Sequence, residues 1–360
     1  MYVADAHCDF LYYMLHREYD VAVPRAGQAV DIPGMRAGGA AMQLFAAWMD
    51  PDEDVTFLQQ CMSLIDAYKR MLAANSMLTP LTKDFEPGQG KIAAVLTIEG
   101  GEAIEERLEN LRLFHELGVK AMTLTWNDQN ELASPAMARR DKGLSRLGRS
   151  VVREMERINM AVDVAHLSDA SIDGVLDEIS APIFSSHTNA RAVLKHRRSL
   201  SDRHIREIAR RGGVVGVNYY SPQLVERGRA RIEDIVKHIE HIAAVGGIDC
   251  VALGSDFDGM PRSSSGRLSR RTEQLEGCSQ AYRSIAKSRL WRKRYPQNSL
   301  RQSFELYEAV RLGLYSGFVH YARYFVSRKR AAYYRYAFML RPLCAEHIRG
   351  DAVRPYYARH

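Results

Sequence analysis

The sequence predicts an α/β protein of the (β/α)8, or TIM-barrel, class with a divergent basic C-terminal segment. Three observations support this. Strand-like and helix-like segments alternate through residues 1–261, an order that gives parallel strands joined by crossover helices. That length suits one eight-unit barrel. Five of the eight predicted strands also finish in ionisable side chains. A doubly wound open sheet is the alternative.

The predicted strands are short apolar runs bounded by polar or glycine-rich sequence. They cover residues 2–9, 40–47, 92–99, 121–125, 161–166, 183–187, 214–218 and 250–256. Between them, apolar residues recur at helical spacing, which predicts helices over residues 54–74, 103–117, 147–158, 168–178 and 202–211. A serine or aspartate opens the last of these helices, as expected of an N-cap.

The polar strand ends favour a closed barrel over an open sheet. They are His7, Asp9, Glu99, His166, His187 and Asp256. A barrel gathers the carboxyl ends of its strands around one mouth, whereas an open sheet spreads them along an edge. Each residue alone has an ordinary explanation, as a hydrogen-bonded strand end or a helix cap. If the residues did not form one site, all of these separate explanations would have to be true at once. One shared site is the simpler explanation.

His7 and Asp9 stand two residues apart and therefore point to the same face of a strand. An imidazole nitrogen and a carboxylate oxygen are ligands that zinc accepts. If the strand ends converge, two carboxylates and three histidines suit a pair of metal ions, and Asp256 is left to handle a proton. None of the serines or cysteines lies in a nucleophile-elbow motif, which disfavours a Ser-His-Asp hydrolase.

The composition is that of a chain with a large core, since 46% of the residues are apolar. The five cysteines are scattered without CxxC spacing, which favours neither a disulfide framework nor a thiolate zinc site. No apolar run approaches the ~20 residues of a membrane helix, and Met1 runs directly into the first strand without a leader. We therefore expect a cytoplasmic protein with no membrane span.

The charge changes sign after Pro261. Residues 1–261 carry a net charge of −8 and residues 262–360 a net charge of +15, with 11 of the 18 tyrosines in the basic part. Three explanations are open for this segment. The first is a basic appendage, partly helical over 300–326, that contacts nucleic acid or anionic lipid. The second is a divergent eighth helix with a dimerisation segment. The third is sequence translated outside its ancestral reading frame.

The motifs of the acidic part resemble those of the membrane (renal) dipeptidase family, peptidase family M19, within the metal-dependent hydrolases. They are DAHCD at residue 5, TIEGGEAI at 97, LTWNDQNELA at 124, DVAHLSD at 163, APIFSSHTNARAV at 181, RRSLSD at 197, GGVVGVN at 212 and ALGSDFDG at 252. They occur in family order and stop near residue 261. The resemblance therefore implies a dipeptidase-like barrel over residues 1–261, with residues 262–360 departing from the family.

The resemblance also implies the role of each site residue. His7, Asp9 and Glu99 hold one zinc ion, Glu99, His166 and His187 hold a second, and Glu99 bridges the two. A hydroxide between the ions attacks the peptide bond of a dipeptide. Asp256 is the catalytic acid and base, and Arg198 anchors the substrate carboxylate or the developing oxyanion. Small dipeptides are the expected partners, nucleic acid is not, and a homodimer is possible.

Trp126 departs from the mammalian members, which carry a histidine that contacts substrate at this position. An indole donates one hydrogen bond but carries no charge. Trp126 is therefore expected to bind substrate differently from that histidine. The alternatives to a dipeptidase are another small-amide hydrolase of the same group, acting on N-acyl amino acids, and a non-catalytic barrel whose basic tail binds nucleic acid or membrane.

Overall fold

The alternating strands and helices form a curled parallel sheet surrounded by helices. In this computed structural model, residues 3–51 and 53–259 are described. The strands are β1 (Val3–Asp5), β2 (Ala40–Trp48), β3 (Leu78–Pro80), β4 (Ile92–Glu99), β5 (Ala121–Thr123), β6 (Ala161–Asp163), β7 (Val215–Val217) and β8 (Val251–Leu253). The predicted boundary at residue 261, the helix over 300–326 and the basic segment lie outside the described residues.

The strands follow the order β6-β5-β4-β2-β1-β8-β7, and β3 pairs with β4 beside this path. All the pairings between strands are parallel. Isolated bridges from Phe184 to Asp163 and from Ser185 to Val215 link β6 to β7 and complete the ring. The predicted TIM-barrel class is confirmed.

The sixth predicted strand, over residues 183–187, is not a regular strand. It takes part in the ring only through those isolated bridges, and Pro182 precedes it without a backbone N–H. The N–H of Ser186 donates to the Asp163 side chain at 2.9 Å instead of to a neighbouring backbone. Backbone hydrogen bonds of Phe184 and Ser185 still join the segment to both neighbouring strands, and the Asp163 side chain takes the place of a backbone acceptor at Ser186.

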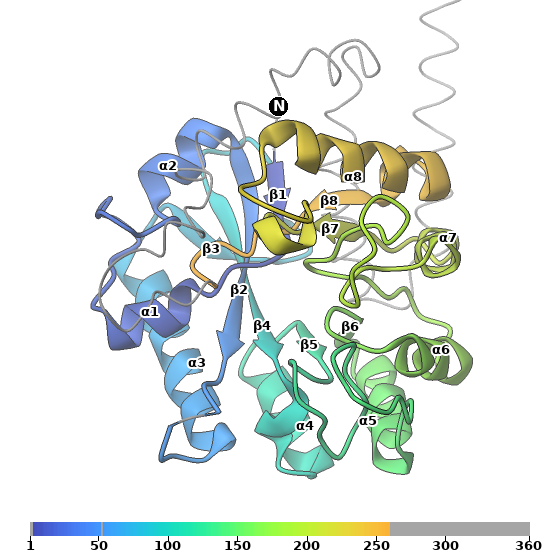
Figure 1. The fold of residues 1–360 in the computed structure, drawn as a ribbon. Helices are drawn as coiled ribbons and strands as arrows, with labels where there is room; N and C mark the ends of the chain where they lie inside the picture. Colours follow the sequence, from blue (N-terminus) through green and yellow to red (C-terminus); the bar gives the residue numbers. More distant parts are fainter. Residues whose placement is uncertain (1–2, 52, 260–360) are drawn as a thin grey trace, which may run out of the picture. The chain divides into compact units, whose positions relative to one another are not determined.

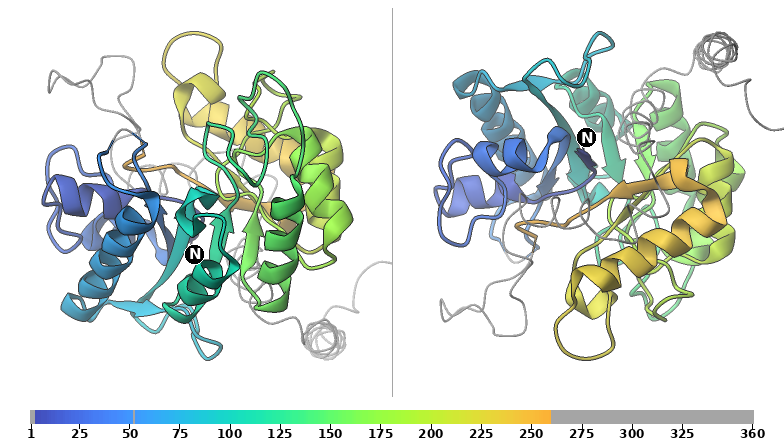
Figure 2. Two further views of the ribbon diagram at one scale, coloured as in Figure 1. Left: turned by 90° about the horizontal axis from the view of Figure 1, so that it is seen from below. Right: turned by 90° about the horizontal axis from the view of Figure 1, so that it is seen from above.

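The helices lie outside the ring of strands (Figures 1 and 2). They are α1 (Phe10–His16), α2 (Ile32–Gly38), α3 (Phe57–Ala74), α4 (Leu108–Glu116), α5 (Arg146–Arg157), α6 (Asp169–Glu178), α7 (Asp202–Arg210) and α8 (Ile232–Gly246). The five predicted helices correspond to α3–α7. A 3-10 turn, Gly101–Ile104, replaces the start of the helix predicted over 103–117, because Glu105 and Glu106 adopt positive φ angles and interrupt it.

Hydroxyl side chains cap four of the described helices, among them α7, for which the sequence predicts a serine or aspartate cap. Ser201 accepts the N–H of His204 and so caps α7, and Ser145 and Ser168 cap α5 and α6 in the same way. Thr56 and Gln59 form a reciprocal capping box at α3. Each cap satisfies a backbone N–H that has no partner within the helix. The caps therefore fix the residue at which each helix begins.

The interior of the barrel is apolar at its base and polar at its mouth. Alternate residues of β4 point inward, so Ala93 and Val95 belong to the interior cluster, and Leu81 and Phe85 close that cluster below. Continuing the same alternation, Thr97 and Glu99 are inward-facing positions. The strand pattern itself therefore carries Glu99 to the centre of the mouth.

Two glycines let the last strands approach the segment that carries His187. A Cβ atom on Gly216 or on Gly254 would lie 1.9 Å from the carbonyl oxygen of Ser186. Any larger residue would push β7 or β8 away from that backbone. Glycine at both positions is what allows Asp256, which follows β8, to lie near His187.

Burial of His238 makes the stability of the barrel depend on pH. This side chain is fully buried on α8, and its Nδ1 accepts the N–H of Ala190 at 3.1 Å. Burial, and then the nearby His241, lowers the pKa of His238 to about 4 from 6.5. Between these values the unfolded chain binds a proton that the folded chain does not. The free energy of unfolding therefore falls as the pH falls from 6.5 to 4, by up to about 3 kcal/mol from this group.

We expect His238→Asn to remove this contribution, because Asn Oδ1 can accept the same N–H but does not titrate. Urea unfolding at a series of pH values between 7 and 4 measures it. The difference in stability between wild type and variant should shrink, or reverse in favour of the variant, as the pH falls. Parallel pH profiles for the two proteins would contradict the assignment.

Candidate metal centre

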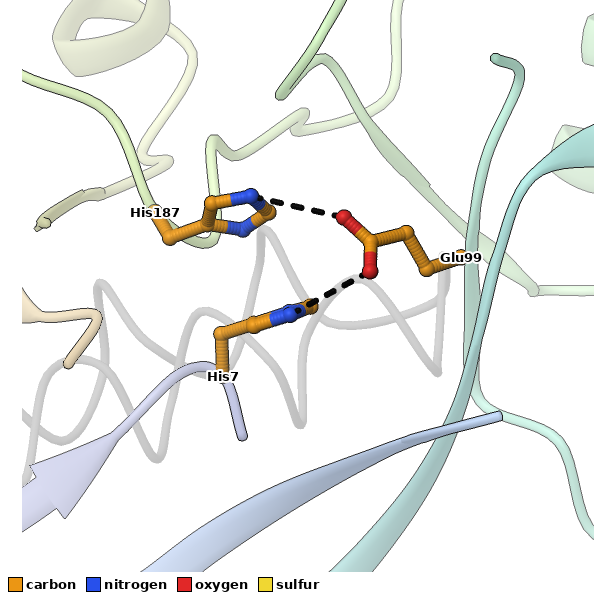
Figure 3. A group of neighbouring side chains, drawn as sticks. All are labelled: His7, Glu99 and His187. Atoms are coloured by element: carbon orange, nitrogen blue, oxygen red, sulfur yellow. Dashed lines mark ion pairs between the residues drawn. The ribbon is translucent and has the colours of Figure 1, made fainter. Parts of the chain in front are cut away.

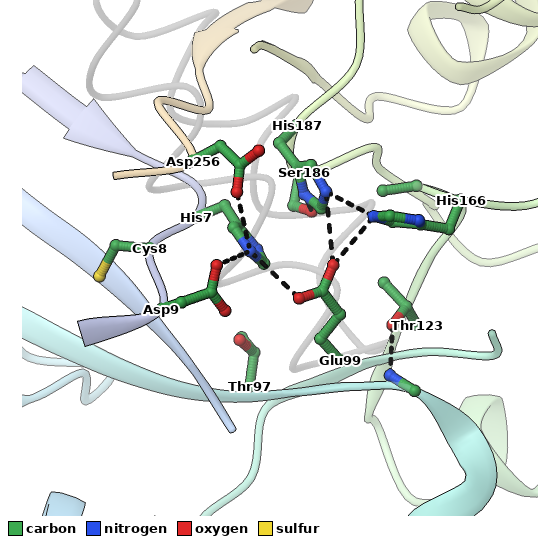
Figure 4. A network of polar contacts seen from close by, with 12 residues as sticks. His7, Cys8, Asp9, Thr97, Glu99, Thr123, His166, Ser186, His187 and Asp256 are labelled. Atoms are coloured by element: carbon green, nitrogen blue, oxygen red, sulfur yellow. Dashed lines mark hydrogen bonds and ion pairs between the residues drawn. The ribbon is translucent and has the colours of Figure 1, made fainter. Parts of the chain in front are cut away.

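The sequence-predicted ligands meet at the carboxyl ends of the strands. His7 and Asp9 follow β1, Glu99 ends β4, His166 follows β6 and His187 follows the bridged segment. All five are buried, with at most 6% of each residue exposed. Figure 4 shows their side chains pointing toward one another from different sides of the ring.

Glu99 lies between two groups of side chains. Its Oε2 is 3.5 Å from His7 Nε2, which is in turn 3.4 Å from Asp9 Oδ2. Its Oε1 is 3.0 Å from His166 Nε2 and 3.4 Å from His187 Nε2. Figure 3 shows the one carboxylate with His7 and His187 at its two oxygens. One carboxylate is thus shared by two adjacent ligand sets.

This arrangement fits metal ions by geometry. Two donor atoms bound to one tetrahedral zinc at ~2.0–2.2 Å lie roughly 3.3–3.6 Å apart, close to the distances around Glu99. In addition, His7 Nε2 and Asp9 Oδ1 are buried without a hydrogen-bond partner. Buried polar atoms are rarely left without partners, and a cation between these groups would supply one.

The charges in the site also suit a cation. Burial lowers the pKa of His7, but the carboxylates of Glu99 and Asp9 outweigh burial and hold that pKa well above 6.5. The site therefore attracts positive charge. Burial lowers the pKa of His166 to about 4, assisted by Arg198, and lowers that of His187 well below 6.5, assisted by His7. Both of these histidines are therefore neutral at pH 7, the form that binds metal.

Neighbouring polar groups fix how the two histidines present their nitrogens. Nδ1 of His166 lies 3.0 Å from Asn127 Oδ1, which can only accept, so Nδ1 carries the proton and Nε2 keeps its lone pair. Nδ1 of His187 lies 2.8 Å from Ser186 Oγ. Such partners orient metal-binding imidazoles in general.

Asp163 holds the backbone that carries both histidines. Its Oδ1 accepts the N–H of Ala165 and that of Ser186, each at 2.9 Å. The first bond fixes the turn in which His166 has a φ of 66°, and the second fixes the segment before His187. One buried carboxylate therefore positions two predicted ligands from separate parts of the chain.

Asp256 lies at the edge of the ligand cluster. Its Oδ1 is 3.9 Å from His7 Nε2, and its Oδ2 accepts from Asn218 Nδ2 at 3.1 Å. Burial raises the pKa of Asp256 to about 8, and the charges of Asp9 and Glu99 add to the rise, against His7. A carboxyl group with this pKa can hold and release a proton near neutral pH. His7, Asp9 and Asp256 are also close enough to one another to share an ion.

A cavity of about 1010 Å³ opens above the cluster. Seven of the eight sequence-predicted site residues line it: Asp9, Glu99, Trp126, His166, His187, Arg198 and Asp256. His7 is buried beside Asp9 and Glu99. Arg198 is 6% exposed. Among the described residues, its guanidinium makes a single hydrogen bond, a long one of 3.4 Å from Nη2 to the His187 carbonyl. The fold thus brings all eight residues together.

Several residues at the site were not predicted from the sequence. Asn127, Asp163, Ser186 and Asn218 support the predicted residues, and Trp48 lines the cavity. A signal existed for two of them, because Asn218 ends the seventh predicted strand and Trp48 directly follows the second. Nothing in the spacing of the others indicated a partner.

Within the described part of the chain, no helix combines the length and apolarity that crossing a membrane requires.

Comparisons with known proteins agree with this picture. An uncharacterized dipeptidase of Schizosaccharomyces pombe is 32% identical over 258 residues, which cover 66% of this chain and 62% of that protein. The chain thus spans less than two thirds of this relative's length. Among solved structures, a metallopeptidase from Rhodobacter sphaeroides bound to a phosphinate mimic of L-Ala-D-Ala has a TM-score of 0.74 at 24% identity, covering 86% of this chain and 99% of that one.

A probable dipeptidase from Pseudomonas aeruginosa, PvdM, also gives a TM-score of 0.74, at 17% identity, with coverage of 87% of this chain and 95% of that chain. At these identities the structures establish the fold. The family model for membrane dipeptidase, peptidase family M19, matches residues 1–273, which is most of the chain. On this match, and on the fold and site that accompany it, the chain belongs to the membrane dipeptidase family, peptidase family M19.

Proposed function

We propose that the protein is a zinc-dependent dipeptidase that hydrolyses the peptide bond of small dipeptides. The observation that carries the proposal is the position of Glu99, whose two oxygens face separate ligand sets on the floor of a cavity of about 1010 Å³. His7 and Asp9 would hold one ion, His166 and His187 the other, and Glu99 both. The relatives named as dipeptidases, and the one solved with a dipeptide mimic, support the substrate class.

When bound, two zinc ions would lower the pKa of a shared water to give hydroxide near neutral pH and would polarise the scissile carbonyl. The protein's own groups then manage the proton and the substrate. Asp256 would take the proton released from the attacking water and pass it to the leaving nitrogen as the C–N bond breaks. Arg198 would bind the substrate carboxylate, since a buried guanidinium with few protein partners has donors to spare.

Hydrolysis of a mixed dipeptide library by the full chain tests the proposal. We expect free amino acids to appear, the rate to fall at least a hundredfold after dialysis against a chelator, and zinc to restore it. N-acyl amino acids tested in parallel distinguish the related small-amide hydrolases. Hydrolysis of these compounds alone would contradict the dipeptidase assignment, and so would dipeptide hydrolysis that the chelator does not change.

A further inference from the structure

One wall of the cavity is aromatic. Trp48 lies at its centre, with the ring of Tyr12 at 5.0 Å and that of Trp126 at 5.3 Å, both edge to face. All three residues line the cavity. The hydroxyl of Tyr12 donates to Asp50 at 2.9 Å, which fixes the outer edge of the wall. We name Tyr12, Trp48 and Trp126 the aromatic wall.

The wall stands directly beside the ligand cluster. Trp48 pairs with Glu99 in the register between β2 and β4, and paired residues on adjacent strands project to the same face about 5 Å apart. At its other end, the ring of Trp126 lies 6.3 Å from that of His166. A group bound at Glu99 therefore has aromatic surface within contact distance on the β2 side.

Arg198 lies across the mouth from Trp48, the central residue of this wall. Around the ring, β2 is four positions from the bridged segment at Phe184–Ser185, which is the opposite side of a ring of eight. Arg198 follows that segment, and its Nη2 contacts the His187 carbonyl. The ligand cluster thus lies between the Arg198 side of the mouth and the Trp48 side.

The two ends of a dipeptide differ chemically in a way that matches these two sides of the ligand cluster. Its carboxylate belongs to the second residue, and the scissile carbonyl belongs to the first, about one residue length away. With the carboxylate at Arg198 and the scissile carbonyl at the ligand cluster, the first residue extends toward β2. Resting on the dipeptidase function proposed above, we propose that the aromatic wall binds the side chain of the first residue, and that the enzyme prefers dipeptides whose first residue is large and apolar.

The preference follows from the surface that the wall offers. A phenylalanine or leucine side chain would cover the indole faces and displace water from them, whereas glycine would leave them wet. A pocket for an apolar side chain commonly discriminates by tenfold or more between large and small groups. The second residue lies on the Arg198 side, so its side chain should contact the aromatic wall much less and should have little effect on the preference that the wall produces.

The test varies each residue of the substrate separately. We expect kcat/KM for Phe-Ala to exceed that for Gly-Ala by tenfold or more in the wild-type protein. Trp48→Ala and Trp126→Ala should bring this ratio close to one and leave the ratio for Ala-Phe over Ala-Gly unchanged. Trp126→Phe keeps an aromatic face and should retain most of the preference. The zinc content of each variant checks that the cluster is intact.

The outcomes separate this inference from the function on which it rests. Equal rates for Phe-Ala and Gly-Ala, or wall variants that alter only the second-residue ratio, would overturn the inference and leave a dipeptidase. If no dipeptide is hydrolysed, the proposed function fails and the inference falls with it.

Discussion

Glu99→Ala is expected to abolish metal binding at both ligand sets at once and to lower kcat/KM for dipeptides on the order of a thousandfold or more, since bound metal supplies several kcal/mol of transition-state stabilisation. The reason is that its two oxygens face His7 on one side and His166 and His187 on the other, within 3.0–3.5 Å. Removing the carboxylate also removes negative charge that would offset the repulsion between two cations.

Elemental analysis of the purified protein measures this loss together with steady-state kinetics. Wild type should hold about two zinc ions per chain, and the variant should hold close to none. Glu109→Ala, an exposed position on α4, is the matched control and should keep both metal and activity. Wild-type protein that binds no zinc tightly would instead favour a non-catalytic barrel. A variant that kept one ion would show that Glu99 serves one ligand set.

Asp256→Asn is expected to lower kcat by roughly 10²- to 10⁴-fold, the usual contribution of a general acid or base, while zinc content stays at the wild-type level. Asparagine has the shape of aspartate and tolerates a positive φ, which is 59° at this position. The amide can still interact with Asn218 but cannot shuttle a proton. The change therefore removes the proton-handling chemistry and little else.

Metal analysis decides between the two possible roles of this residue. His7, Asp9 and Asp256 are close enough to hold an ion together, so loss of zinc from Asp256→Asn would make Asp256 a ligand and not the acid and base. Asp249→Asn, an exposed change at the opposite end of β8, is the control and should alter neither quantity.

The barrel and the ligand residues at its strand ends could be predicted because both depend on local sequence. Strand alternation places Glu99 on the same inward face as Ala93 and Val95, and this pattern is visible in the sequence. Parallel strands joined by helices put every carboxyl end at one mouth. Residues that end strands were therefore expected to meet, and the structure brings them within a few ångströms of one another.

The supporting residues could not be predicted in the same way. Asp163 accepts backbone N–H groups from both histidine-bearing segments, although it is 23 residues from Ser186. Asn127 reaches His166 across 39 residues. These bonds depend on the conformation of the loops that follow the strands, and neither composition nor periodicity predicts loop conformation. The same holds for the contact of Tyr12 with Trp48, which depends on where α1 packs.

By itself, the sequence determined the order of strands and helices and the residue type at each strand end, because alternation and capping act over a few neighbouring residues. Only the tertiary structure decided that one carboxylate faces two ligand sets and that Trp48 stands opposite Arg198. Those relations follow from closure of the ring, which brings β2 and the segment before His187 to opposite sides of one cavity although about 140 residues separate them in the chain.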